Sequence, residues 1–332
     1  MLDTRLALAL TEGGLILRDC GRIAVFGASD DSDLAGLSQE QVVIIEGFKP
    51  SYDAWRARGY ACDVTIDTEY DAVVLALPRS KADARAMIAL ASKFSRGPVV
   101  IDGQKTDGID SVLRDVRKRV EISGPISKAH GKLFWSALLP YDSFQDWEAG
   151  PALTEGGFWT APGVFSADAV DPASAMLAQT LPDHLGAEIA DLGAGWGFLA
   201  AHILTRDDVK HVHLVEANHM ALECAKRNVT DSRAIFHWAD ATHWSEKGLD
   251  AVVMNPPFHK GRAAEPAIGR DFIRQAARSL APRGNLWMVA NRHLPYEATL
   301  QEHFAKVTEI GGDARFKLFY ASKPLRKSRA RV

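Results

Sequence analysis

Short apolar runs alternate with amphipathic segments along the second half of the chain. From Ala187 onward the apolar runs are AEIADLG, HVHLVEA, AIFHWAD, LDAVVMN and GNLWMVAN, and the helix-like segments between them include GFLAAHILT, HMALECAKRN and RDFIRQAARSL. Strands that alternate with helices in this way form a parallel sheet that is covered on both faces. The pattern therefore predicts an α/β domain.

The first half repeats this rhythm with the runs RIAVFGAS, VVIIEG, CDVTI, YDAVVLALP and PVVIDG. Residues 71–81 (DAVVLALPRSK) align without a gap with residues 250–260 (DAVVMNPPFHK). Such similarity indicates a duplication, so we predict two related α/β domains joined within residues 140–162. The first copy has ALPR at 76–79 where the second has NPPF at 255–258. We therefore expect the first copy to have kept its core and lost its polar strand ends.

Composition agrees with two globular domains and excludes some classes of protein. The chain has 332 residues, more than the roughly 100–200 residues of one typical domain. No run approaches the ~20 apolar residues of a membrane helix. Three cysteines without paired spacing favour the reducing cytoplasm. A net charge of −3 argues against broad, sequence-independent nucleic-acid binding, so a nucleic-acid partner would meet a local patch.

A glycine-rich turn indicates a nucleoside-type cofactor. The segment IADLGAGWGFLAAHIL places three glycines between a strand and a helix, where bare backbone can approach a ligand. Glu216 ends the next strand, where it can accept hydrogen bonds from a ribose, and Asp240 ends the third, where it can face an adenine ring. The spacing is GxGxG and not the GxGxxG of pyrophosphate sites. S-adenosylmethionine, which has no phosphate, therefore fits better, with Asp191 facing its cationic amino-acid end.

The candidate cofactor residues share this edge of the predicted sheet. They are Asp191, Gly193, Ala194, Gly195, Gly197, Glu216, Ala217, Asp240, Ala241 and Asn255. A tight strand-to-helix turn without a ligand is the alternative reading of the glycines alone.

The sequence NPPF at 255–258 indicates catalysis on an amino group. Such a group on a purine ring or an amide is a poor nucleophile, because its lone pair is delocalised. The side-chain carbonyl of Asn255 and the main-chain carbonyl of Pro256 can each accept a hydrogen bond from the amino group. The two prolines fix the backbone that carries these carbonyls. Phe258 offers a face for stacking. The candidate catalytic residues are Asn255, Pro256, Pro257 and Phe258; a Pro-Pro turn with an inward-packed phenylalanine is the alternative.

Basic residues after this motif are candidates for substrate contact. His259, Lys260 and Arg262 can meet phosphates that flank a base stacked on Phe258, or form a solvated loop. The C-terminal KPLRKSRARV and the basic residues of 114–119 invite the same two interpretations.

No metal site is expected. The histidines of the second half have neither a cysteine nor a carboxylate that completes a ligand set; they are His211, His213, His237 and His243.

These motifs carry a resemblance to known proteins. DLGAGWG together with NPPFH resembles the class I S-adenosylmethionine-dependent methyltransferases that modify exocyclic amino groups. The motifs PGVFS at 162–166, NPPFH at 255–259, AN..LPY at 290–296 and RFKLFY at 315–320, with GPISKAHGKLF at 124–134, are similar to the ribosomal RNA small subunit methyltransferase C family.

The resemblance implies a fold and a reaction. The fold is α/β, with two tandem Rossmann-like class I methyltransferase domains that each contain a seven-stranded, mostly parallel sheet. Residues 1–145 would form a degenerate domain for substrate positioning or support, and residues 155–332 the catalytic domain. The reaction is methylation of the N2 amino group of a guanine in 16S rRNA of the small ribosomal subunit, with S-adenosyl-L-homocysteine as the product. We also expect a cytoplasmic monomer without a membrane segment.

Four other functions remain open. A sister family methylates a guanine N2 in large-subunit 23S rRNA and shares NPPFH. A protein glutamine-N5 methyltransferase uses the same Asn-Pro-Pro motif but usually carries tyrosine where this chain has Phe258. DNA adenine methylation is disfavoured by the absence of a basic overall charge. A non-catalytic module that binds S-adenosylmethionine during ribosome assembly belongs to a different class.

Overall fold

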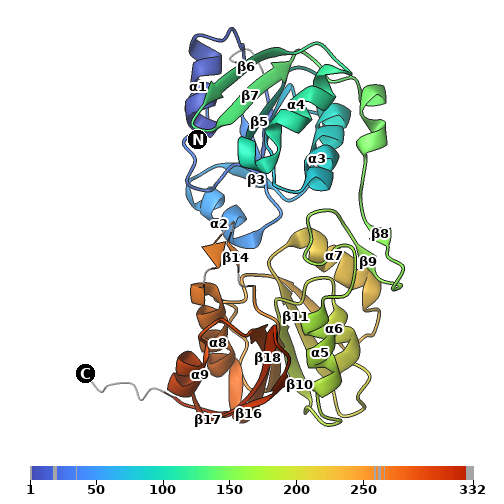
Figure 1. Ribbon diagram of the computed structural model, residues 1–332, viewed down its shortest axis with the longest axis vertical. Helices are drawn as coiled ribbons and strands as arrows, with labels where there is room; N and C mark the ends of the chain where they lie inside the picture. The colour runs from blue at the N-terminus through green and yellow to red at the C-terminus, as the bar shows by residue number, and fades with distance from the viewer. Residues whose placement is uncertain are drawn as a thin grey trace, which may run out of the picture. The chain divides into compact units, whose positions relative to one another are not determined.

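The computed structural model describes residues 2–17, 21–34, 36–257, 259–260, 263–264 and 266–326, with the backbone alone for residues 259, 260, 263 and 264. The chain divides into two compact units, Met1–Pro151 and Ala152–Val332 (Figure 1). The roles expected for the two domains, degenerate and catalytic, are not tested by this division and stay predictions.

The first unit is a seven-stranded sheet with helices on both faces. Its strand order is β3-β2-β1-β4-β5-β7-β6, and β1 to β5 run parallel. The strands are β1 (Ile23–Phe26), β2 (Val42–Ile45), β3 (Ala61–Asp63), β4 (Ala72–Ala76), β5 (Val99–Gln104), β6 (Ser123–Lys128) and β7 (Gly131–Ser136). The helices are α1 (Leu2–Thr11), α2 (Lys49–Ala57), α3 (Lys81–Phe94) and α4 (Ile109–Arg117), with 3-10 turns at Lys105–Asp107, Tyr141–Ser143 and Gln145–Trp147.

The second unit repeats this sheet in the same order, β12-β11-β10-β13-β16-β18-β17. Its strands are β10 (Glu188–Leu192), β11 (His211–Glu216), β12 (Ala234–Trp238), β13 (Leu249–Met254), β16 (Leu280–Asn291), β17 (Phe304–Gly312) and β18 (Phe316–Pro324). Its helices are α5 (Pro172–Thr180), α6 (Phe198–Ile203), α7 (His219–Asn228), α8 (Pro266–Ser279) and α9 (Glu297–His303). Two short ladders pair β8 (Ala152–Leu153) with β9 (Trp159–Thr160), and β14 (His259–Lys260) with β15 (Ala263–Ala264). The predicted fold class is confirmed.

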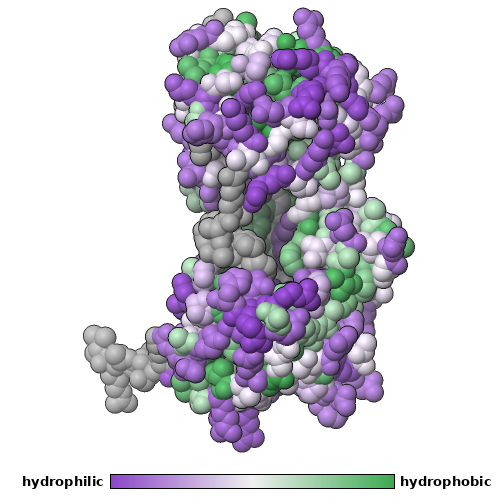
Figure 2. Space-filling view, viewed as in Figure 1, coloured by the Kyte–Doolittle hydropathy of each residue, from purple (hydrophilic) through white to green (hydrophobic). Residues whose placement is uncertain are grey.

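Apolar residues on both faces of each sheet explain why the strands read as continuous apolar runs. In the second unit Ile189 packs into a core with α5, α6 and α7, whereas its neighbour Ala190 packs into a core with α8 and α9. Figure 1 shows these two groups of helices on opposite sides of the sheet. Figure 2 shows mainly hydrophilic residues on the visible face of the first unit. Among the described residues no helix is long and apolar enough to cross a membrane.

The aligned aspartates Asp71 and Asp250 have the same task in the two units. Asp71 accepts a hydrogen bond from the N–H of Arg22 (2.7 Å), just before β1. Asp250 accepts hydrogen bonds from the N–H groups of Ala187 (2.8 Å) and Glu188 (3.1 Å), at the start of β10. Each carboxylate thus joins the central strand to its parallel neighbour. The equivalent contacts agree with the gapless alignment of the two segments.

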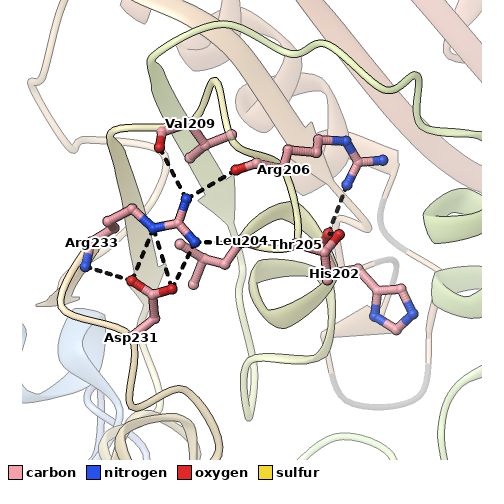
Figure 3. Close-up of polar contacts among 7 residues, drawn as sticks. All are labelled: His202, Leu204, Thr205, Arg206, Val209, Asp231 and Arg233. Carbon is pink, nitrogen blue, oxygen red and sulfur yellow. Dashed lines mark hydrogen bonds and ion pairs between the residues drawn. The ribbon is translucent and has the colours of Figure 1, made fainter.

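Arg233 holds the connection from α6 to β11 against the start of β12 (Figure 3). Its guanidinium donates hydrogen bonds to the carbonyls of Leu204 (2.5 Å), Arg206 (2.9 Å) and Val209 (3.1 Å). It also pairs with Asp231 (2.7 Å), and this hydrogen bond lowers the pKa of Asp231 to about 2. The contacts therefore join the segments that lead into β11 and β12.

Candidate active site

The structure brings the glycine turn and Asn255 together at one pocket. Leu192 at the end of β10 is in register with Met254 at the end of β13, so the segments that follow leave the sheet side by side. The pocket is lined by Phe165, Ser166, Asp171, Ser174, Gly193, Ala194, Gly195, Trp196, Phe198, Leu199 and Asn255. Of the predicted cofactor residues, Gly193, Ala194, Gly195 and Asn255 line it directly.

Gly195 adopts a backbone conformation that favours glycine. Its φ is +55°, and a Cβ at this position would have no atom within 4 Å, so its side faces open space. Its N–H donates a hydrogen bond to Oε2 of Glu216 (2.8 Å). The bare backbone and the hydrogen bond therefore hold the turn open toward the pocket.

Glu216 supports the backbone on both sides of the turn. Besides Gly195, it accepts a hydrogen bond at Oε1 from the N–H of Asn218 (2.7 Å), which begins α7. Burial raises the pKa of Glu216, and the backbone N–H groups act in the opposite direction. Because a carboxylate has about four lone-pair sites, two remain for the ribose hydroxyls that the sequence predicts.

Asp191 lies in the interior of β10, one layer below the pocket lining. Its residue is fully buried, and neither carboxyl oxygen has a hydrogen-bond partner among the described residues. Burial, followed by repulsion from Glu216, raises its pKa to about 8. A positively charged group beside this carboxyl would stabilise its ionised form. Asp191 does not itself line the pocket.

Asp240 is engaged in its own loop. Its carboxylate accepts hydrogen bonds from the N–H (2.8 Å) and hydroxyl (2.7 Å) of Thr242, and lies 2.8 Å from Nδ1 of His243. Ala241 beside it is buried. The carbonyl of Ala217 accepts a hydrogen bond from the indole of Trp238 (2.9 Å). Gly197 begins α6 behind the pocket lining, where a Cβ would approach Val229.

The amide of Asn255 has a defined orientation. Its Nδ2 donates to Oδ2 of Asp171 (2.9 Å) and to Oγ of Ser174 (2.9 Å). No hydrogen bond reaches its Oδ1 from the described part of the chain, and this oxygen is not among the enclosed polar atoms. The side-chain carbonyl is therefore left as a free acceptor at the pocket.

The remaining predicted catalytic and substrate residues are only partly described. Pro256 is buried and Pro257 is exposed. Phe258 and Arg262 lie outside the described residues, as does the tail from residue 327. The backbone of His259 and Lys260 forms β14. The roles proposed for these side chains stay predictions.

Sequence reasoning missed Asp171 and Ser174, and it quoted Phe165 and Ser166 only within the PGVFS motif. Asp171 begins α5, and its carboxylate also accepts a hydrogen bond from the N–H of Ser174 (2.8 Å). An aspartate before a proline and a helical segment is a typical helix start. That signal predicts the helix but not the contact with Asn255.

A second hollow lies at the carboxyl end of β16. In the sheet, β16 neighbours β13 on the side away from β10. It is lined by Asn291, Arg292, His293, Ala314, Arg315 and Phe316. Arg292 is held by the carbonyls of Asp313 (2.7 Å) and Phe316 (3.0 Å). Arg315 is mostly exposed, and its guanidinium lies 5.0 Å from the centre of the Phe316 ring. The AN..LPY and RFKLFY motifs marked these segments without assigning them a contact.

Carboxylates lie beside three of the four histidines at positions 211, 213, 237 and 243. Glu188 contacts His211 (2.8 Å) and approaches His213 (3.8 Å), and Asp240 contacts His243 (2.8 Å). The sequence pattern could not show the contacts of Glu188, since Glu188 is on the neighbouring strand. Within the described ranges no group of three or more acidic, histidine or cysteine residues could hold a metal ion.

The strand order, the glycine turn and the Asn-Pro-Pro end of the fourth parallel strand define a class I methyltransferase fold. The family model of the methyltransferase small domain matches residues 155–320, and the chain belongs to this family.

Relatives and a solved structure agree with this assignment. The chain is 28% identical to ribosomal RNA small subunit methyltransferase C of Hahella chejuensis, over 77% of this chain and 78% of the relative. It is 24% identical to the protein of that name from Alteromonas mediterranea, over 94% and 98%. Ribosomal RNA large subunit methyltransferase G of Alcanivorax borkumensis is 33% identical, over 49% and 43%.

The structure of the T. thermophilus 16S rRNA N2 G1207 methyltransferase in complex with AdoMet and guanosine superimposes with a TM-score of 0.77, at 24% identity, over 93% of this chain and 90% of that one. The resemblance expected from the sequence motifs is confirmed.

Proposed function

We propose that the protein transfers the methyl group of S-adenosylmethionine to the N2 amino group of a guanine in 16S rRNA of the small ribosomal subunit. One observation carries this proposal: the amide of Asn255 is held by its nitrogen, so its carbonyl oxygen is free at the pocket that the glycine turn lines. A free carbonyl at this place is suited to accept a hydrogen bond from an amino group.

The relatives favour the small subunit. The two that match most of the chain are named for it, whereas the match to the large-subunit enzyme is confined to about half of the chain. Phe258, where protein-glutamine methyltransferases usually carry tyrosine, argues against a protein substrate, but the large-subunit family shares NPPFH. The residues that distinguish the two rRNA substrates would then lie outside the half of the chain that matches the large-subunit enzyme.

The residues present fit S-adenosylmethionine. Gly193 and Gly195 leave room for its amino-acid part, Asp191 supplies the negative charge that a buried cation requires, and Glu216 has lone pairs for the ribose. Asp240 and Ala241 would face the adenine. When bound, the cofactor supplies an electrophilic methyl group on a sulfonium.

The chemistry of this chain is then mainly positioning. The carbonyls of Asn255 and Pro256 would each accept a hydrogen bond from the guanine amino group. These two hydrogen bonds would draw the lone pair of the nitrogen out of conjugation with the ring. Phe258 would support the base, and the methyl group would meet the lone pair in line. The amino proton becomes acidic after transfer, so no strong general base is required. Asn255, Pro256, Pro257 and Phe258 are the proposed catalytic residues.

Contacts with the RNA strand are proposed on both sides of the target. His259, Lys260 and Arg262 would meet phosphates next to Phe258. The hollow at Arg292, His293 and Arg315 lies along the same edge of the sheet and offers cationic groups beside the ring of Phe316, which suits a neighbouring nucleotide. Residues 155–332 would carry catalysis, and residues 1–145 would position the RNA.

Transfer of labelled methyl groups tests the function. Purified protein is incubated with methyl-labelled cofactor and either unmodified small subunits, free 16S rRNA, large subunits or a release-factor peptide. We expect label in 2-methylguanosine from the small-subunit substrates. Label only in large-subunit rRNA or in glutamine would reject the proposed substrate, and cofactor binding without transfer to any of them would favour the non-catalytic module.

Asn255→Ala should lower kcat by about 100-fold or more, because the acceptor that orients the amino group is lost. Asn285→Ala is the matched control, since it removes an amide from the neighbouring strand β16 away from the pocket lining, where Asn285 accepts a hydrogen bond from the hydroxyl of Tyr320 (2.9 Å). Equal activity of Asn255→Ala and the wild type would contradict the mechanism.

A further inference from the structure

Two side chains from the start of α5 control the amide of Asn255. Oδ2 of Asp171 and Oγ of Ser174 each lie 2.9 Å from Nδ2 of Asn255. The same Oδ2 caps α5 by accepting the N–H of Ser174 (2.8 Å). Ser174 is buried, with 7% of its surface exposed. The contact spans 84 residues of sequence and joins the helix to the end of β13.

The polarity of this contact permits one orientation of the amide. A carboxylate only accepts hydrogen bonds, so Asp171 requires the NH2 group of Asn255 on its side. The opposite orientation would place Oδ1 of Asn255 against a negative charge and leave two acceptors facing each other. Hydrogen bonds to an ionised group are among the stronger ones. The carbonyl is consequently directed away from α5.

We propose that Asp171 and Ser174 are positioning residues of the methyl transfer, which fix the carbonyl oxygen of Asn255 as the acceptor for the substrate amino group. This inference rests on the proposed function of the site. With the amide reversed, an NH2 group would meet the NH2 group of the substrate, and two donors cannot bond to each other. Neither residue touches the reacting atoms in this scheme; both act through Asn255.

The first experiment separates positioning from folding. Asp171→Ser keeps a residue that caps helices well, but its side chain is too short to reach Asn255. Ser174→Ala removes the second acceptor. We expect each to lower kcat by about 10- to 100-fold, while KM for the RNA stays within about threefold of the wild-type value, because the lost contacts act on the orientation of Asn255.

Matched variants control for lost caps and lost hydroxyls. Ser80→Ala removes the cap of α3 in the first unit, where Ser80 accepts the N–H of Asp83 (3.3 Å). Thr180→Ala removes a hydroxyl from α5 itself. Both should keep the wild-type kcat. Asp171→Asn can place Oδ1 where Oδ2 of Asp171 lies, so it should be at least about fivefold more active than Asp171→Ser. Wild-type kcat in both Asp171→Ser and Ser174→Ala would overturn the proposal.

A second experiment does not depend on the RNA substrate. The side-chain amide protons of Asn255, observed by NMR in protein labelled with ¹⁵N-asparagine, should exchange slowly with water in the wild type and much faster in the Asp171→Ser/Ser174→Ala double variant. Equal exchange rates would overturn the inference. If the wild type methylates none of the RNAs but shows the protected amide, the proposed function fails while the orientation of Asn255 stands.

Discussion

Asp191 has an unusual energetic state for an aspartate. A buried polar group without a hydrogen-bond partner is costly, and both oxygens of this carboxyl lack one. Burial and the nearby Glu216 raise its pKa to about 8, so the carboxyl is protonated at neutral pH unless a cation approaches. The buried carboxyl thus lowers the stability of the folded protein.

Asp191→Asn should stabilise the protein without cofactor, and more so as the pH rises. Between pH 4 and pH 8 the unfolded carboxyl has lost its proton while the folded one keeps it, so the wild type loses stability over this range as pH increases. Asparagine does not titrate. We expect a higher melting temperature than that of the wild type at pH 8, a smaller difference at pH 5, and weaker cofactor binding.

Asp183→Asn, at an exposed aspartate of the same unit, is the control and should change neither quantity. A melting temperature of Asp191→Asn below that of the wild type at pH 8 would contradict the account.

At the scale of elements, the sequence predicted what local periodicity determines. The runs RIAVFGAS and AEIADLG became β1 and β10 because parallel strands covered on both faces are apolar throughout. The glycine turn and Asn255 were predictable because each sits at the end of such a strand. The partners of Asn255 were not, because Asp171 and Ser174 lie 84 and 81 residues away and no local pattern encodes that distance.

α8 packs closely against the start of α9 at Gly269, and a substitution there tests this contact. A Cβ added to Gly269 would clash with Oη of Tyr296, a fully buried residue whose hydroxyl has no partner in the described chain. Although alanine usually stabilises a helix relative to glycine, Gly269→Ala should lower the free energy of unfolding by about 1–3 kcal/mol through overpacking. Denaturant midpoints measure this.

Tyr296→Phe removes the nearest of the three atoms that an alanine would meet and leaves the ring carbons Cζ and Cε1 in close contact. It also removes an unsatisfied buried hydroxyl. It should be neutral or stabilising by itself, and Gly269→Ala should cost less in its background. If the two changes are simply additive, the contact with the hydroxyl of Tyr296 is not the cause.

At the scale of the whole molecule, the two units share one strand order but differ in the residues at equivalent strand positions. The register of the strands places Val25 where the second unit has Asp191, and Ala76 where it has Asn255. The expectation that the first copy lost its polar strand ends holds at these places. It is wrong at Glu46, which follows β2 at the position where Glu216 ends β11. Glu46 accepts a hydrogen bond from the N–H of Phe48 (2.7 Å), as Glu216 does from the N–H of Asn218.

The helix before the first strand is pinned to the sheet in both units by different chemistry. In the second unit α5 reaches Asn255. In the first unit Arg5 of α1 is fully buried and pairs through two nitrogens with Asp102 of β5 (2.5 and 2.8 Å). Leu2 and Asp3 of the same helix line a hollow with Ser29 and Ala76, at the edge that corresponds to the cofactor pocket.

Arg5→Met should destabilise the first unit by about 3–5 kcal/mol, because it leaves Asp102 buried without its cation. Burial already raises the pKa of Asp102, and Arg5 acts against this rise. The Arg5→Met/Asp102→Leu double variant should recover most of the loss. Hydrogen exchange of β1 and β5 in the full-length chain measures both effects, and a double variant as unstable as Arg5→Met would contradict the account.

The pair of Arg5 and Asp102 also bears on the history of the duplicated chain. Once both residues were in place, a descendant that lost either one alone would carry an uncompensated buried charge and be removed by selection. Each partner of this pair therefore constrains the other, and neither position can change alone without cost to the first unit.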